Sequence, residues 1–211
     1  AGGVQKLFAE GLRAYMLGLS DAFTLEAARH DVQAPHVPKG NAHLLGDLDG
    51  KKETVRLEME KLRKLVEARK PMALEVATTE AECDQLWALR REFSNALRAT
   101  GLTKLNQDIV VPRSRLVDLI AFAEDLSKRS GFPIACFGHA GDGNVHVNIM
   151  ADRYNRAAAV RERVEAALDE LFAQVLAWGG VITGEHGIGL GKKRWGPERT
   201  SGGGGERERA A

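Results

Sequence analysis

The chain has little of what marks several large classes of protein. Its 211 residues include only two cysteines, and its 30 basic side chains nearly balance its 29 acidic ones. Two cysteines are too few for a disulfide-rich secreted domain. We therefore expect Cys83 and Cys136 to be reduced and to act as small buried side chains. The charge is balanced, and no Lys/Arg-rich stripe is interleaved with aromatic residues. The sequence therefore lacks the basic surface that is typical of nucleic-acid-binding proteins.

Long apolar runs are also missing. No stretch approaches the roughly 20 apolar residues that a helix needs to cross a bilayer, and no charged start with a hydrophobic block and cleavage site marks a secretory signal. The apolar content, 44% of residues, is ordinary for a globular domain. We therefore expect a soluble, cytoplasmic protein that meets a membrane only through its partners.

A glycine-rich segment, GHAGDGNVHVN at residues 138–148, predicts a β-hairpin. The Asp142-Gly143 pair is a strong turn signal, and a short apolar run at 134–137 precedes it. Side chains alternate between the two faces of a strand. One face should therefore carry Val145, Val147 and Ile149 toward a core, and the other Asn144, His146 and Asn148.

A second segment, TGEHGIG at residues 183–189, adds an adjacent acid and base. Two imidazoles and a carboxylate suit a catalytic metal site with one position open to water or substrate, and His139, His146 and Glu185 form such a set. His186 then remains free for proton transfer. A histidine beside a hairpin is usually solvated or hydrogen-bonded, so the metal hypothesis depends on the two segments meeting. The donors fit zinc, manganese, iron or cobalt.

Hydrophobic periodicity and capping signals predict an α+β fold with a largely antiparallel sheet. We expect helices over 11–29, 51–68, 79–98, 114–130 and 155–178, and strands at 42–48, 73–77, 107–111, 134–137, 145–149 and 181–183. From residue 107 the order β-α-β-β-α-β is ferredoxin-like, and the preceding β-α-β indicates a partial second copy. Residues 1–41 form an N-terminal helix and connector, 42–196 the main domain, and 197–211 a disordered Gly/Arg/Glu tail.

The paired motifs GHAGDGNVHVN and TGEHGIG resemble the C-terminal, substrate-capping domain of FAD-linked oxidases in the vanillyl-alcohol oxidase superfamily. The branch most similar to them contains D-lactate, glycolate and D-2-hydroxyglutarate dehydrogenases. LWALRREFSNAL at 86–97 and KLNQDIVVPRSRL at 104–116 resemble the segments that precede the metal motif in that branch. The resemblance covers residues 42–196 and implies a cap domain of duplicated ferredoxin-like subdomains, which lies over the flavin ring.

The resemblance also implies roles for individual residues. The metal ligands would be His139, His146 and Glu185. The substrate-binding residues would be Asn148, Arg90, Ser94 and Lys104. His186 would be the catalytic base, and His186 and Gly187 would lie beside the flavin.

Together these roles imply oxidation of a D-2-hydroxy acid to the 2-oxo acid, with a divalent metal bound and the hydride passed to FAD. No segment resembles the FAD-binding half, so we expect a fragment, a product of an altered reading frame or a split subunit that needs an FAD-binding domain or subunit. Electrons would leave to another protein or a quinone. Two alternatives remain open, a metal-dependent hydrolase with the same His/His/Glu set and a non-catalytic detached cap that binds a partner.

Overall fold

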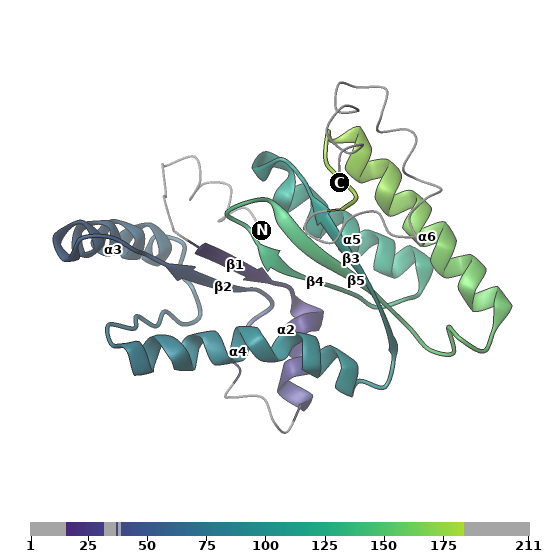
Figure 1. Ribbon diagram of the computed structural model, residues 1–211, viewed down its shortest axis with the longest axis horizontal. Coiled ribbons are helices and arrows are strands. Elements are labelled where there is room, and N and C mark those ends of the chain that lie inside the picture. The colour runs from purple at the N-terminus through teal and green to yellow at the C-terminus, as the bar shows by residue number, and fades with distance from the viewer. Residues whose placement is uncertain (1–15, 32–36, 38, 184–211) are drawn as a thin grey trace, which may run out of the picture.

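A computed structural model describes residues 16–31, 37 and 39–183 of the chain (Figure 1). Its centre is one five-stranded sheet in the order β2-β1-β4-β5-β3. Each neighbouring pair in this sheet is antiparallel, which confirms the predicted α+β class with a largely antiparallel sheet. The strands are β1 (Met16–Ser20), β2 (His43–Asp47), β3 (Thr103–Val110), β4 (Ile134–His139) and β5 (Asn144–Ala151).

Helices cover both faces of the sheet, and one helix stands apart (Figure 1). The pair α2 (Ala22–His30) and α4 (Glu80–Ala99) covers one face, and α5 (Leu116–Ser130) and α6 (Ala158–Ala177) cover the other. A short 3₁₀ turn, η1 (Arg113–Arg115), leads into α5. The fifth helix, α3 (Lys52–Glu67), projects beyond β1 and β2 and has no buried residue. None of the helices described here is both long and apolar enough to cross a membrane.

The two helix layers bury different side chains of the same strands. On the α5/α6 side, Val147 and Ile149 of β5 are fully buried with Leu171 and Phe172 of α6. On the α2/α4 side, Phe93 and Leu97 pack with a smaller group that includes Phe137 of β4. The predicted alternation along the hairpin is therefore confirmed. Its apolar positions enter the larger core, and its polar positions face α4.

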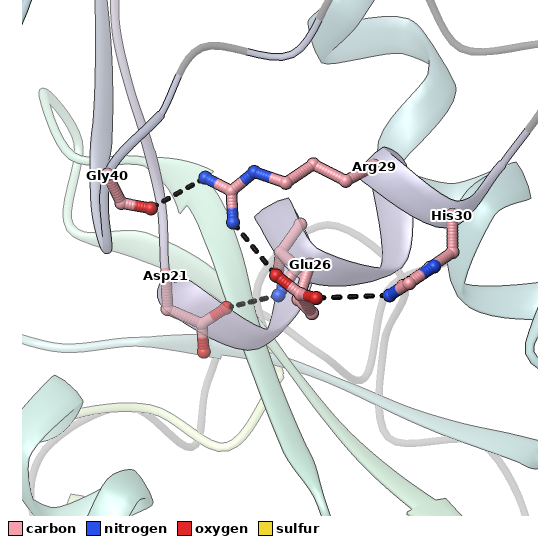
Figure 2. Close-up of polar contacts among 6 residues, drawn as sticks. Asp21, Glu26, Arg29, His30 and Gly40 are labelled. Atoms are coloured by element: carbon pink, nitrogen blue, oxygen red, sulfur yellow. Dashed lines mark hydrogen bonds and ion pairs between the residues drawn. The ribbon is translucent and has the colours of Figure 1, made fainter.

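Hydrogen bonds fasten helix α2 to the sheet and to the segment that follows it, and Figure 2 shows those at the two ends of the helix, from Asp21 and from Arg29. Asp21 caps the helix by accepting from the Thr24 N–H at 2.9 Å, and its other carboxylate oxygen accepts from the Cys136 N–H of β4 at 2.7 Å. At the far end of the helix, Arg29 donates to the Gly40 carbonyl at 2.7 Å. Asp21 thus joins α2 to the strand that leads into the hairpin.

The hairpin turns at residues 140–143, where the sequence predicted it. Gly143 has a φ of +76°, and a Cβ placed there would collide with the carbonyl oxygen of Val111. The Val111 N–H in turn donates to the Gly143 carbonyl at 3.0 Å. The turn therefore lies against the end of β3 because glycine allows both the positive φ and the close approach.

Three predicted elements were wrong in whole or in part. The helix expected over 11–29 is confirmed only from Ala22 on, as α2, whereas Met16–Ser20 is strand β1, because Leu17 and Leu19 alternate into the core with a period of two and Asp21 begins the helix. Residues 73–77 pair with none of the described strands, and Leu74 and Val76 are exposed. Within the described residues, the strand expected at 181–183 is reduced to one bridge between Val181 and Val110.

The remaining predictions of helices and strands agree with the structure to within a few residues. The Thr79–Glu82 capping box begins α4 as expected. Gly131, in the left-handed conformation at a φ of 73°, ends α5. The predicted tail at 197–211 lies outside the described residues.

Candidate functional site

The candidate site lies on the face of the sheet that α4 crosses. Antiparallel register pairs Asp108 and Asn106 of β3 with His146 and Asn148 of β5. It also pairs His146 with Phe137 of β4. Because directly paired residues point to the same face, these five side chains form one continuous polar and aromatic patch.

A hollow of about 340 Å³ opens on this patch, between α4 and the strands. Its floor is the ring of Phe137, which lies 5.0 Å from the guanidinium carbon of Arg90 and 5.5 Å from the Lys104 Nζ. The Lys104 Nζ donates a hydrogen bond to the Ser94 Oγ at 2.7 Å. The hollow is lined by Arg90, Ser94, Arg98, Lys104, Asn106, Phe137 and His146.

The charged side chains that line the hollow, Arg90, Arg98 and Lys104, are all basic. Burial lowers the pKa of Arg90 and is also the main cause that lowers the pKa of Lys104, with the nearby Arg98 charge as a second cause. The Arg90 Nε is buried without a hydrogen-bond partner among the described residues. In the described part of the chain no carboxylate lines the hollow. Cationic groups held in this way favour an anionic ligand, which would supply the missing hydrogen bonds.

The two histidines of the hairpin also point to this face. His139 of β4 is paired with Asn144 of β5, and His146 follows Asn144 by two residues. The two imidazoles therefore occupy diagonal positions on the same face of the hairpin. The His146 Nδ1 lies 4.0 Å from the Asp108 Oδ1, and Asp108 is almost fully buried. At 4.0 Å this pair is too far apart for a hydrogen bond, so the Asp108 carboxylate acts on the His146 ring through its charge.

Glu185, the third ligand expected from the sequence, follows the last described residue, Thr183, by two positions. Glu185, His186 and Gly187 lie outside the described residues. Within residues 16–31, 37 and 39–183, no three potential metal-binding side chains come together. The structure thus brings His139 and His146 to one face, next to the hollow that collects Arg90, Ser94 and Lys104.

Asn148 is fully buried in the middle of the same face. Its Nδ2 donates to the carbonyls of Ala135 and His146, both at 3.2 Å. Its Oδ1 has no hydrogen-bond partner among the described residues. These bonds hold the amide in one orientation, and the oxygen can accept a hydrogen bond from a ligand that covers the patch.

Sequence reasoning missed Arg98, Asn106, Phe137 and Asp108. The signal for Arg98 is its spacing, because residues 90, 94 and 98 recur every four positions and therefore share one face of α4. Asn106 and Asp108 follow Lys104 with the period of two of a strand. Phe137 gave no such signal, because an aromatic residue in an apolar run is usually part of a core.

Comparison with known proteins gives a consistent result. Residues 3–206 match the family described as FAD linked oxidases, C-terminal domain. The glycolate oxidase subunit GlcD of Bacillus subtilis is 37% identical over 148 residues, which are 70% of this chain and 31% of that protein. A D-lactate dehydrogenase of Anaerostipes hadrus is 31% identical, over 72% of this chain and 32% of its own length. The chain thus spans about a third of these relatives.

Two further comparisons cover a shorter segment or concern the fold. The mitochondrial D-2-hydroxyglutarate dehydrogenase of Rattus norvegicus is 32% identical over 121 residues, which are 56% of this chain and 21% of that protein. Among solved structures, a 4-ethylphenol oxidase from Gulosibacter chungangensis superposes with a TM-score of 0.56 at 13% identity, over 85% of this chain and 41% of that one. That likeness concerns the fold alone.

Proposed function

This chain belongs to the FAD-linked oxidase C-terminal domain family, and from that premise we propose that it is the substrate-binding part of a flavin-dependent 2-hydroxy acid dehydrogenase. The reaction would oxidise a D-2-hydroxy acid to the 2-oxo acid. One observation carries the proposal: a cationic hollow adjoins the histidine hairpin on one face of the sheet.

The residues of the hollow suit the carboxylate of such a substrate. Arg90 and Lys104 lie over the same aromatic ring, and the Lys104 Nζ is already oriented by the Ser94 Oγ. A carboxylate bound there would receive charge-assisted hydrogen bonds from Arg90 and Lys104 and would place the hydroxyl-bearing carbon toward His146. Asn148, whose Oδ1 is buried and accepts no described hydrogen bond, would orient the substrate or the flavin edge.

The hairpin fits a divalent metal site, with zinc, manganese or iron as the proposed occupant. We propose that His139 and His146 would supply two imidazole nitrogen donors on one face and Glu185 the third ligand, with Asp108 4.0 Å from His146. A divalent cation, when bound, lowers the pKa of a coordinated hydroxyl. His186 would accept the proton of that hydroxyl.

FAD would be held mainly by a separate FAD-binding domain or subunit, and His186 and Gly187 of this chain would face it. Bound FAD supplies the hydride acceptor. The polar edge of the patch, at the exposed Asn106 and the partly buried His146, suits contact with a polar ring system. We further propose a duplicated ferredoxin-like fold, a cytoplasmic location, and a protein or quinone as the final electron acceptor.

Anaerobic flavin reduction tests this proposal in the complete flavin-loaded protein that contains this chain. We expect D-2-hydroxy acids to bleach the flavin absorption band, and the L-enantiomers to do so far more slowly. Arg90→Ala should raise KM or Kd for the acid by about tenfold or more, because it removes a charge-assisted hydrogen bond. His146→Ala should lower both the metal content and the rate of flavin reduction.

Arg91→Ala is the matched control for Arg90→Ala. Arg91 is the next residue of α4, but it is exposed, lies outside the hollow and donates to the Asp84 carbonyl at 3.2 Å. It should leave substrate affinity unchanged. Failure of every 2-hydroxy acid to reduce the flavin would refute the proposed function, and full activity of metal-free His146→Ala would refute the metal site alone.

A further inference from the structure

Helix α3 is the described α-helix that the rest of the fold leaves uncovered. None of its 16 residues is buried, and it projects beyond β1 and β2 (Figure 1). The large apolar side chains that are exposed in the described part of the chain all belong to this helix or to the segments next to it, namely Leu44, Leu57, Met72, Leu74 and Val76. Apolar surface gathered in one region indicates a contact surface, whereas scattered single residues would not.

One side of α3 carries an apolar stripe. Val55, Met59, Leu62 and Val66 follow one another at intervals of four, three and four residues, which places them on the same side of the helix. All four side chains remain partly exposed. The stripe therefore has the pattern of a buried helix face without the burial.

Basic side chains border the stripe, and most acidic ones lie away from it. Lys52 precedes Val55 by three residues, and Arg63 follows Met59 by four, so both are surface neighbours of the stripe. Of the four acidic residues, one borders the stripe, Glu58, and three lie on the opposite half of the helix, Glu53, Glu60 and Glu67. The apolar side of α3 is thus also its more basic side.

The segment also holds a surplus of positive charge. Residues 51–70 contain eight basic and four acidic side chains, although the whole chain has 30 and 29. The arginines are engaged within the helix, Arg56 with Glu53 and Glu60 and Arg63 with Glu67. The lysines that form no ion pair with a described residue are Lys51, Lys52, Lys64 and Lys70. The surplus is therefore carried by lysines.

We propose that α3 binds an anionic lipid surface and lies in its plane, with the apolar stripe at the boundary of the acyl chains. A basic amphipathic helix binds membranes in this way, and each Lys or Arg near an anionic leaflet adds attraction. This direct contact goes beyond the contact through partners that the sequence predicts. It is a docking surface that the proposed reaction does not use.

The charges favour lipid over the other possible occupants of the stripe. Two copies of α3 would bring two positive surpluses together, which disfavours a second copy of the chain. A protein interface favours arginines, which form fixed bidentate pairs, but the arginines of α3 already have partners. Lysines are flexible point charges, and a fluid layer of headgroups can meet them without a fixed geometry.

Vesicle sedimentation tests this inference in the 211-residue chain and in the complete flavin-loaded protein that contains it. We expect binding to equimolar vesicles of phosphatidylglycerol and phosphatidylcholine to be about tenfold or more tighter than binding to phosphatidylcholine alone. Raising the salt from about 0.1 M to about 1 M should remove most of that difference, because the Debye length falls from about 10 Å to about 3 Å.

Two pairs of matched variants locate the contact. Leu62→Glu should weaken binding to the anionic vesicles about tenfold or more, because it places a charge in the stripe, whereas Leu57→Glu, on the opposite side, should change it about threefold or less. Lys52→Gln with Arg63→Gln should likewise weaken binding about tenfold or more. Lys61→Gln with Lys64→Gln removes the same charge from the far side and should have an effect of about threefold or less. Since none of these side chains is buried, the variants should fold.

Several outcomes would overturn the inference. They are equal binding to the two kinds of vesicle, equal effects of Leu62→Glu and Leu57→Glu, and loss of vesicle binding in the complete protein. Self-association without vesicles that Leu62→Glu abolishes would identify a second copy as the occupant and would also overturn it. Flavin reduction by 2-hydroxy acids tests the proposed function separately, so failure of one leaves the other standing.

Discussion

Asp21 joins α2 to the sheet through both oxygens of its carboxylate. One oxygen caps the helix at the Thr24 N–H, and the other accepts from the Cys136 N–H of β4. The residue is only 8% exposed, and burial raises the pKa of its carboxyl above the ordinary value of 3.8. A single side chain therefore both begins a helix and positions the strand that carries the histidine hairpin.

Replacing Asp21 with alanine should destabilise the protein by about 2–4 kcal/mol, because the helix loses its cap and the Cys136 N–H is left buried without a partner. Because a raised carboxyl pKa means that the folded state binds the proton more tightly, the stability from Asp21 is complete below 3.8 and declines as the pH rises. The cost of the substitution should therefore be larger near pH 4 than near pH 7. Urea denaturation at the two pH values measures both effects.

Thr79→Ala provides the comparison for Asp21→Ala. Thr79 caps α4 in the same manner, but its capping box with Glu82 is exposed and anchors no strand. We expect a loss of about 1 kcal/mol for this variant. Equal losses for the two substitutions would mean that the bond to Cys136 adds nothing to the cap.

Single residues of the site were only partly predictable from the sequence. The hairpin motif pointed to His139, His146 and Asn148, because a glycine turn and the alternation of a strand can be recognised in the sequence without knowledge of tertiary contacts. Arg98 and Asp108 were missed because their importance comes from α4 crossing the sheet and from the register of β3 with β5. Local spacing places each residue on a face of its own element, but it does not show which other element that face meets.

At the scale of elements, the β4-β5 hairpin depends on two glycines that a side chain would displace. Gly138 and Gly143 each lie where a Cβ would collide with backbone, of Asn144 and of Val111 respectively. Gly143 also has a φ of +76°. The turn that presents the two histidines is thus held by close backbone packing against the end of β3.

Gly143→Ala should cost about 3 kcal/mol or more, because it combines a positive φ with a backbone collision. Gly179→Ala is a matched control, since Gly179 has a φ of +73° but nothing within 4 Å of an added Cβ. That variant should lose only about 1 kcal/mol. Thermal and urea unfolding would measure both variants, and similar losses would show that the contact with Val111 is not rigid.

Elements with local signals were predictable, and elements defined by their partners were not. Caps at Thr79 and Gly131 marked helices correctly, because each satisfies backbone groups within its own segment. Strand β1 was mistaken for helix because Leu12, Met16 and Leu19 recur at helical spacing in the sequence, and only pairing with β2 and β4 decides between the two. Residues 73–77 have a strand-like sequence but no described strand partner.

At the scale of the whole molecule, stability is distributed unevenly over the fold. Helices α5 and α6 share one core with β3, β4 and β5, whereas α3 has no buried residue and extends away from the sheet (Figure 1). The described apolar side chains that are most exposed, Leu57 and Met72, lie on α3 and just after it. The hollow and the hairpin therefore lie on the part of the molecule that packs around the cores, and α3 lies outside it.

Native-state hydrogen exchange should separate these two parts. We expect the amides of α3 to exchange through local opening, at rates far above those of α5 and α6, because few buried contacts oppose the unwinding of α3. Its ion pairs, such as Arg56 with Glu60 at 2.8 Å, are exposed and add little resistance. Protection of α3 equal to that of α6 in the 211-residue chain would contradict this expectation. Protection that appears only in the presence of the FAD-binding domain would instead identify α3 as part of the surface between the two domains.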